Sequence, residues 1–443
     1  MMLRNLVLII CTLFVNAAYA AVNIQHWQTS KGADVYFVEN HSLPILDLSV
    51  NFAAGSAYDA AQKSGVAGVT RYMMKLGAGG LNEEAISNQL ADIGAELGGE
   101  FDLDRAGFKL RTLSSQKEKQ QSLAILKMIL QQPDFPEKVL EREKARIIAN
   151  LQEAATEPDS IANKALMAAL YGAHPYALPE SGDENTIAQL KREDLLQFYQ
   201  QFYSAKGAVV ALIGDVSRDE ASQIAENLTA GLPVLSGDRP TIPTVNLPAS
   251  AVEKRLQHPA SQSHILLAYP GTKRGDPDLF PLYVGNYILG GGGFVSRLTE
   301  DVREKRGLVY SVYSYFMPMK EFGPFQIGLQ TKKEQGEEAL TLVRATLDNF
   351  LKKGVTEQEL KAAKANIIGG FPMRIDSNKK ILDYLSVIGF YKLPLNYLDE
   401  YNQKVASVTA AQIKEAFNRR LKPEHFVTVI VGEVDKNTQP KSQ

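Results

Sequence analysis

The sequence predicts an α+β fold made of two similar halves, each a sheet covered by helices. Alternating apolar stretches typical of strands open and close each half, with helical periodicity between them. Segments near both ends of the first half also recur in the second half. The chain has 443 residues, of which 45% are hydrophobic and 22% charged, and this suits roughly two to four globular domains.

The predicted elements of the first half follow in a regular order. Two strands come first, then two helical regions, a third strand and two helices that end at Pro133 and Pro158. A last helix leads into an apolar strand that closes at Gly214. The predicted ranges are 34–39, 45–53, 65–76, 83–97, 107–113, 118–132, 137–156 and 192–203. We expect these helices to cover one face of the sheet.

The second half repeats the first. The segment AKGAVVALIGDV at 205–216 resembles PEHFVTVIVGEV at 423–434, which aligns Gly214 with Gly432. NFAAGS at 51–56 resembles LAYPGT at 267–272 with nearly the same offset, which aligns Gly55 with Gly271. Segment 231–250 contains several prolines and no hydrophobic periodicity, as is typical of an extended linker. The predicted domains are therefore 21–230 and 251–443, joined by a linker at 231–250.

The first 20 residues have the pattern of a secretory signal peptide. Arg4 is followed by an apolar stretch at 6–15 that is too short to span a bilayer, and Ala18-Tyr19-Ala20 is a cleavage motif. Cleavage after Ala20 would remove Cys11, the one cysteine, which suits an oxidising compartment. We expect a periplasmic protein without a stable membrane anchor.

Charge and histidine content exclude several classes of function. The 48 Lys and Arg residues nearly balance the 50 Asp and Glu residues, so the sequence offers no electrostatic reason to expect a nucleic acid partner. No two of the six histidines lie three to five residues apart, and neither H-x-x-E-H nor G-x-S-x-G occurs. The glycine run at 290–293 lacks the Lys and Ser or Thr of a phosphate loop, and a close-packed turn is favoured there. A Ser-His-Asp set is a spatial arrangement, and nothing in the sequence points to one.

Arg303 and Tyr310 lie on either side of a predicted helix-to-strand corner at Gly307. A guanidinium and a phenol that converge can bind a backbone carbonyl or an oxyanion. From these residues alone, a solvated basic helix end is the favoured interpretation.

Three longer segments resemble the M16 family of pitrilysin or insulinase-like zinc peptidases. They are SGVAGVTRYMMKLGAGG at 64–80, the segment at 171–216, and GGGFVSRLTEDVREKRGLVYSV at 291–312. The resemblance covers about residues 22–434. It implies a LuxS/MPP-like metallohydrolase-type fold, in which two homologous halves with mainly antiparallel sheets form a clamshell around a peptide chamber.

The resemblance also shows what this sequence lacks. The first zinc histidine of the family falls on Gly68, the general-base glutamate on Arg71 and the second histidine on Tyr72, so that GVTRY replaces H-x-x-E-H. The third ligand falls near Asn150, with Glu153 as the nearest acidic alternative. Active members need a zinc-activated water and a carboxylate base. We therefore expect this chain to bind no metal and to be inactive alone, with zinc in a partner subunit.

The substrate-holding residues of the family match Arg303 and Tyr310. The resemblance therefore implies that this corner binds substrate, in place of the solvated basic helix end that the residues alone favoured. It implies a non-catalytic subunit that pairs with a homologous H-x-x-E-H-bearing M16 subunit and binds peptides or unfolded polypeptides. The alternative is a catalytically dead peptide-binding or scaffold protein of the cell envelope. An active enzyme with unconventional ligands is disfavoured, because no histidine pair exists to build its site.

Overall fold

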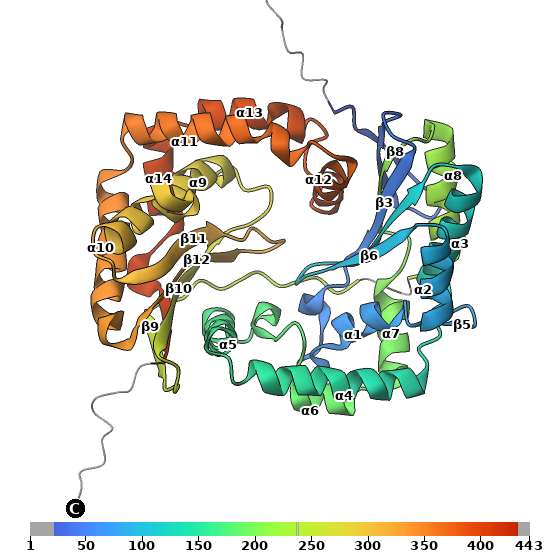
Figure 1. Cartoon of the computed structure of the whole chain (residues 1–443), viewed down its shortest axis with the longest axis horizontal. Coiled ribbons are helices and arrows are strands. Elements are labelled where there is room, and N and C mark those ends of the chain that lie inside the picture. The colour runs from blue at the N-terminus through green and yellow to red at the C-terminus, as the bar shows by residue number, and fades with distance from the viewer. Residues whose placement is uncertain (1–21, 236, 238, 433–443) are drawn as a thin grey trace, which may run out of the picture.

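The structure is a computed structural model that describes residues 22–235, 237 and 239–432 (Figure 1). The predicted signal peptide at 1–20 lies outside the described residues, as does the chain from 433 onward. Among the residues described, no helix is long and apolar enough to cross a membrane.

Each half is built on one mainly antiparallel sheet. The six strands of the first sheet have the order β1-β2-β8-β3-β7-β6, and the five of the second have the order β11-β12-β10-β13-β9. The first-half strands are β1 (Gln25–Gln28), β2 (Asp34–Glu39), β3 (Ile45–Phe52), β6 (Glu96–Phe101), β7 (Ala106–Leu113) and β8 (Val209–Gly214), with a separate pair β4 (Gly77–Ala78) and β5 (Leu81–Asn82). The second-half strands are β9 (Val252–Leu256), β10 (Gln262–Thr272), β11 (Val309–Phe316), β12 (Gly323–Lys332) and β13 (Val427–Val431). The predicted α+β class is confirmed.

Helices fill the sequence between the strands of each half. In the first half they are α1 (Val66–Met73), α2 (Glu83–Asp92), α3 (Gln116–Gln131), α4 (Glu137–Ala154), α5 (Pro158–Tyr171), α6 (Glu184–Gln189), α7 (Arg192–Phe202) and α8 (Arg218–Thr229). In the second half they are α9 (Leu279–Asn286), α10 (Gly336–Lys353), α11 (Glu357–Gly370), α12 (Asn378–Phe390), α13 (Tyr397–Ser407) and α14 (Ala410–Arg420).

The strand pairing shows the duplication that the sequence predicted. β8 pairs antiparallel with β3 and parallel with β2, and β13 pairs in the same way with β10 and β9. The aligned glycines Gly214 and Gly432 end β8 and follow β13, and both have positive φ. A Cβ would lie 2.2 Å from the Ile45 carbonyl oxygen in one case and 2.6 Å from that of Gln262 in the other. Both positions therefore require glycine for the same steric reason.

One helix of each half packs on the sheet of the other half. Helix α5 of the first half packs on β10 and β13, and α12 of the second half packs on β8, β3 and β2. The expectation that helices cover one face of each sheet was therefore wrong, because the opposite face is also covered. Gly389 of α12 permits this close approach, since a Cβ there would lie 2.6 Å from Val209 Cγ1.

Three predicted boundaries differ from the structure. The helix expected at 83–97 ends at Asp92, because the chain turns at Gly94 (φ 62°) and continues as β6. Pro158 begins α5, since proline fits the first turn of a helix as well as it ends one. The glycine run forms a π-helical turn, Tyr287–Gly291, followed by a 3₁₀ turn, Gly293–Val295.

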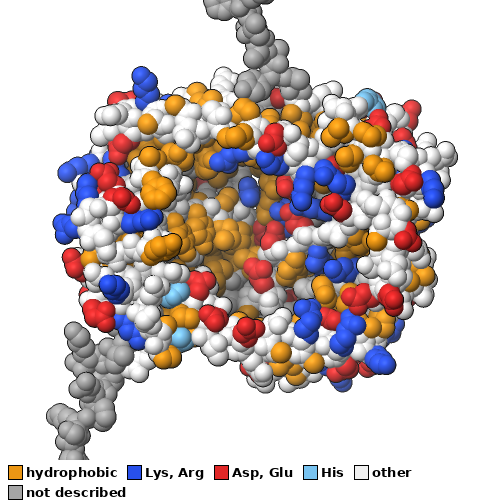
Figure 2. Space-filling view, viewed as in Figure 1, with side chains coloured by type: hydrophobic (Ala, Val, Ile, Leu, Met, Phe, Trp, Pro, Cys, Tyr) orange, Lys and Arg blue, Asp and Glu red, His pale blue; other side chains and the backbone are white. Residues whose placement is uncertain are grey.

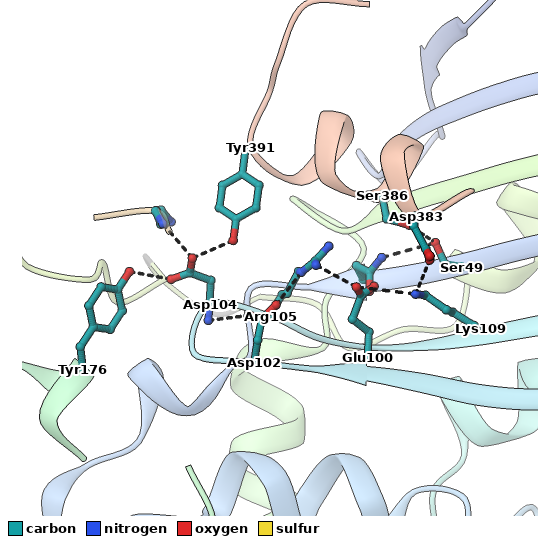
Figure 3. A network of polar contacts seen from close by, with 12 residues as sticks. Ser49, Glu100, Asp102, Asp104, Arg105, Lys109, Tyr176, Asp383, Ser386 and Tyr391 are labelled. Atoms are coloured by element: carbon teal, nitrogen blue, oxygen red, sulfur yellow. Dashed lines mark hydrogen bonds and ion pairs between the residues drawn. The ribbon is translucent and has the colours of Figure 1, made fainter. Parts of the chain in front are cut away.

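The tips of two equivalent hairpins meet between the halves (Figures 1 and 3). Asp104 lies in the turn between β6 and β7 and accepts hydrogen bonds from the hydroxyls of Tyr176 at 2.7 Å and Tyr391 at 2.8 Å. The backbone N–H of Lys320, in the turn between β11 and β12, donates to the same carboxylate at 2.7 Å. Burial raises the pKa of Asp104. One buried carboxylate thus ties three segments together, two of them from the second half.

Candidate functional site

Helix α1 carries the positions aligned with the zinc motif, and a buried carboxylate caps it. Asp59 accepts hydrogen bonds from the backbone N–H groups of Gly65 at 2.7 Å and Ala67 at 2.9 Å. These are among the helix N–H groups that lack a partner within the helix. Burial raises the pKa of Asp59 to about 7. These two hydrogen bonds hold the start of α1 in place, regardless of which side chains the helix carries at the zinc-motif positions.

Neither histidine position holds a side chain that binds a metal ion. Gly68 is half-buried, and a Cβ there would lie 3.2 Å from the ring of Phe101. Tyr72 lies between two cations: Lys75 Nζ is 4.9 Å and Arg146 Cζ 5.1 Å from its ring centroid. Both are cation–π contacts.

The third ligand position is equally changed. Asn150 is exposed on α4, one turn beyond Arg146, and offers a neutral amide. The buried carboxylate of the same helix, Glu143, is bound by Arg142 at 2.8 Å and Arg146 at 2.7 Å. The negative charge of Glu143 is therefore already balanced by two arginines. Glu153, the acidic alternative named from the sequence, lies three residues further along α4, nearly one helical turn, and is exposed.

Arg71 occupies the general-base position and lies on the sheet. Its Nε donates to the Gly107 carbonyl oxygen at 3.3 Å, and its Cζ is 5.5 Å from the ring centroid of Phe108. The guanidinium covers Gly99 of β6, where a Cβ would lie 1.4 Å from Nη2. Burial lowers the pKa of Arg71, as it does that of Lys75, where the charge of Arg71 adds to the effect.

This corner does not fit a zinc ion. Within the described residues, no group of three His, Cys, Asp or Glu side chains could hold a metal. Structural and catalytic zinc sites need at least three such ligands. Arg71, Lys75 and Arg146 would repel a divalent cation. We therefore assign no step to a metal bound by this chain.

Arg303 and Tyr310 lie near each other, on either side of Gly307. The Arg303 Cζ is 5.7 Å from the Tyr310 ring centroid and 5.0 Å from that of Phe294. Gly307 turns the chain between them with φ 63°, and its N–H donates to the Arg303 carbonyl oxygen at 2.8 Å. The nearest carboxylate to Arg303 is Glu304, at 3.6 Å from Nε. The guanidinium therefore keeps donors available.

A strand irregularity turns Tyr310 outward. The pairing of β11 with β12 shifts between Val309 and Ser311, so Tyr310 has no partner in the register. Such bulges redirect a side chain, and they are frequent beside functional sites. β11 is also the edge strand of its sheet. Tyr310 is consequently 78% exposed.

Phe294 and Val295 belong to the same corner, and the sequence analysis missed them. They follow the glycine run and are 70% and 74% exposed. An apolar pair directly after four glycines was the available signal, since exposed large apolar groups are informative. Figure 2 shows a face hollowed at its centre, with hydrophobic side chains gathered on the second-half side of the hollow and charged ones on the first-half side.

Comparison with known proteins agrees with this description. The insulinase family, peptidase family M16, matches residues 35–184, and the family described as peptidase M16 inactive domain matches residues 189–367. The crystal structure of a peptidase M16 inactive domain from Pseudomonas fluorescens is 38% identical, with a TM-score of 0.89 over 93% of this chain and 99% of that chain.

Among more distant relatives, some are named as non-peptidase homologues and others as proteases. A protein described as the non-peptidase homolog YmxG of Helicobacter pylori is 25% identical over 98% of this chain and 100% of its own length. An uncharacterized zinc protease YmxG of Bacillus subtilis is 23% identical over 80% of this chain and 85% of its own. The periplasmic protease PqqL of Escherichia coli, at 16% identity and a TM-score of 0.79, shares the fold over 46% of its length. With Gly68, Arg71 and Tyr72 in place of the zinc motif, the chain belongs to the M16 peptidase family.

Proposed function

We propose that this chain is the non-catalytic subunit of a heterodimeric zinc peptidase of the periplasm. It would pair with a homologous subunit that carries H-x-x-E-H and zinc, and supply Arg303 and Tyr310 to the peptide substrate. The observation that carries the proposal is the asymmetry between the two corners. One offers no group of metal ligands among the described residues, whereas in the other the Cζ of the half-buried Arg303 lies 5.7 Å from the ring centroid of the exposed Tyr310.

The two side chains suit different oxygens of a peptide. The guanidinium of Arg303 donates in a fixed fork, so it can hold a backbone carbonyl in one orientation. The hydroxyl of Tyr310 donates one hydrogen bond, which strengthens as charge develops on a carbonyl oxygen under attack. Phe294 stacks on Arg303 and limits the directions that the guanidinium can take. The proposal assigns binding and orientation to this chain and proton transfer to the partner.

Mixing the chain with its partner tests the proposal. We expect the purified chain to contain no stoichiometric zinc and to cleave no peptide, and the homologous H-x-x-E-H subunit to gain activity when the chain is added. Tyr310→Phe should lower kcat/KM of the complex by about 100-fold, the scale for loss of one oxyanion donor. Arg303→Ala should raise KM as well.

Arg306→Ala is the matched control, because Arg306 is an exposed arginine at the same helix end, outside the Arg303–Tyr310 pair. It should leave the activity of the complex unchanged. One tightly bound zinc and peptide cleavage by the chain alone would falsify the proposal. Peptide binding without any gain of activity in the mixture would instead support the scaffold alternative.

A further inference from the structure

A small pocket in the second half has no role in the proposed function. Its lining comes mainly from α9, α12, α13 and the end of β11, and its volume is about 300 Å³. Small-molecule pockets begin at about this size. Its lining contains Arg274 and Arg374 but no Asp or Glu. A pocket with two cations and no acid carries a net positive charge.

The other arginines around this region are paired with carboxylates. Arg297 binds Glu359 through two hydrogen bonds of 2.7 and 2.8 Å. Arg419 and Arg420 both bind Asp278, at 2.7 and 2.9 Å. These three guanidinium groups are thus satisfied by acids.

Arg274 and Arg374 depart from that pattern. Among the described residues neither makes an ion pair. Arg274 lies 5.1 Å from the ring centroid of Tyr391, and Arg374 lies 5.9 Å from that of Tyr283 and donates a hydrogen bond to the hydroxyl of Tyr384. The Nε of Arg274 is buried without a hydrogen-bond partner. A buried donor left without an acceptor is destabilising, so an acceptor is expected there.

Tyrosines supply the rest of the polar lining. Five of them contribute to the walls: Tyr283, Tyr315, Tyr384, Tyr397 and Tyr401. Burial raises the pKa of Tyr315 to about 12, and it also raises the pKa values of Tyr384, Tyr397 and Tyr401. These phenols therefore stay protonated at neutral pH, able to donate hydrogen bonds. Their rings, with Phe280 and Phe316, offer flat apolar surface.

We propose that this pocket binds a small carboxylate that carries one aromatic or apolar group. The guanidinium of Arg274 matches a planar carboxylate in a bidentate geometry, and Arg374, which is more exposed, lies toward solvent. The apolar group packs against the tyrosine and phenylalanine rings. The inference concerns a site different from the Arg303–Tyr310 corner and does not depend on the proposed function.

Two sources could supply such a group: a free aryl acid, or the C-terminus of a peptide that ends in an aromatic residue. Ligand-observed NMR with the full mature chain distinguishes them. The probes are phenylacetate, its neutral amide, a tripeptide ending in Phe with a free carboxylate, the same peptide as an amide, and inorganic phosphate. We expect saturable binding of phenylacetate and at least tenfold weaker binding of its amide. Binding of the free-acid tripeptide as well would identify a peptide terminus as the source.

Three variants locate the binding. Arg274→Gln should weaken phenylacetate binding at least tenfold, and Arg374→Gln, at a more exposed position, should weaken it to a smaller extent without a risk to folding. Arg306→Gln removes the same charge elsewhere and should have no effect. The proposal is overturned if phenylacetate does not saturate the chain, if its amide or phosphate binds as tightly, or if both pocket variants bind phenylacetate like the unmodified chain.

Discussion

At the residue scale, Arg71 shows how the former catalytic position became structural. Its guanidinium occupies the space over Gly99, so the two residues depend on each other. Gly99→Ala would push the guanidinium off the sheet, and we expect a loss of about 1–2 kcal/mol of unfolding free energy. Gly98→Ala is the control, because its nearest neighbour would be 3.9 Å away. Urea denaturation measures both. The loss should shrink in an Arg71→Ala background, and a loss that persists there would contradict the dependence.

Asp59 gives a pH dependence with a defined sign. Its pKa rises from 3.8 to about 7 on folding because the carboxyl is buried. The folded chain therefore holds this proton where the unfolded chain has lost it, and the contribution to stability falls as pH rises from about 4 to about 7. Asp59→Asn removes the titration, so the melting temperature should change less steeply across that range. An identical slope in the variant would show that another group is responsible.

At the element scale, the packing of α12 on the sheet of the other half determines which glycines tolerate a substitution. Gly389 in α12 faces Val209 and Tyr36 of the opposite half, with 2.6 and 2.7 Å to a new Cβ. Gly369 in α11 has nothing within 4 Å. The same substitution should therefore have opposite signs: Gly389→Ala lowers the unfolding free energy by about 1–3 kcal/mol, and Gly369→Ala raises it by up to about 1 kcal/mol. Thermal denaturation of the two variants checks the signs, and a stabilised Gly389→Ala would disprove the close packing.

At the scale of the whole molecule, the halves share a core as well as a linker. α5 and α12 each pack on the sheet of the other half, and a hydrogen bond of 2.7 Å joins the hydroxyls of Ser49 of β3 and Ser386 of α12. We expect a single cooperative unfolding transition in calorimetry, because neither half can keep its sheet covered alone. Two separate transitions would contradict this.

The hydrogen bonds to Asp104 also join the two halves, and a single substitution can remove one of the hydroxyl donors (Figure 3). Tyr391→Phe removes one of three donors to a buried carboxylate, and we expect a loss of about 1–2 kcal/mol together with faster amide exchange in α12. Tyr287→Phe is the control, since that hydroxyl makes no hydrogen bond among the described residues. Unchanged exchange in α12 would show that the contact does not hold the halves together.

Much of the fold could be predicted because it is encoded locally. The strands β2 and β7, helix α1 and the glycines that close β8 and β13 follow from periodicity and from the repeat. The sequence analysis missed helix α5 and strand β6. Pro158 could end or begin a helix, and Gly94 could lie within a helix or after it, and only the surrounding packing decides between these possibilities. The proline begins a helix, and the glycine connects a helix to an edge strand.

The sequence by itself determined that the zinc ligands are absent, since Gly68 and Tyr72 have no side chain that binds zinc. It also determined that Arg303 and Tyr310 lie at one corner, because seven residues and a glycine turn separate them. Only the tertiary structure decided that Arg71 lies on β6 and β7, that Asp104 joins the halves, and that Arg274 and Arg374 share a pocket without acids. These neighbours are far apart in the chain, and long-range packing brings them together, which no local pattern encodes.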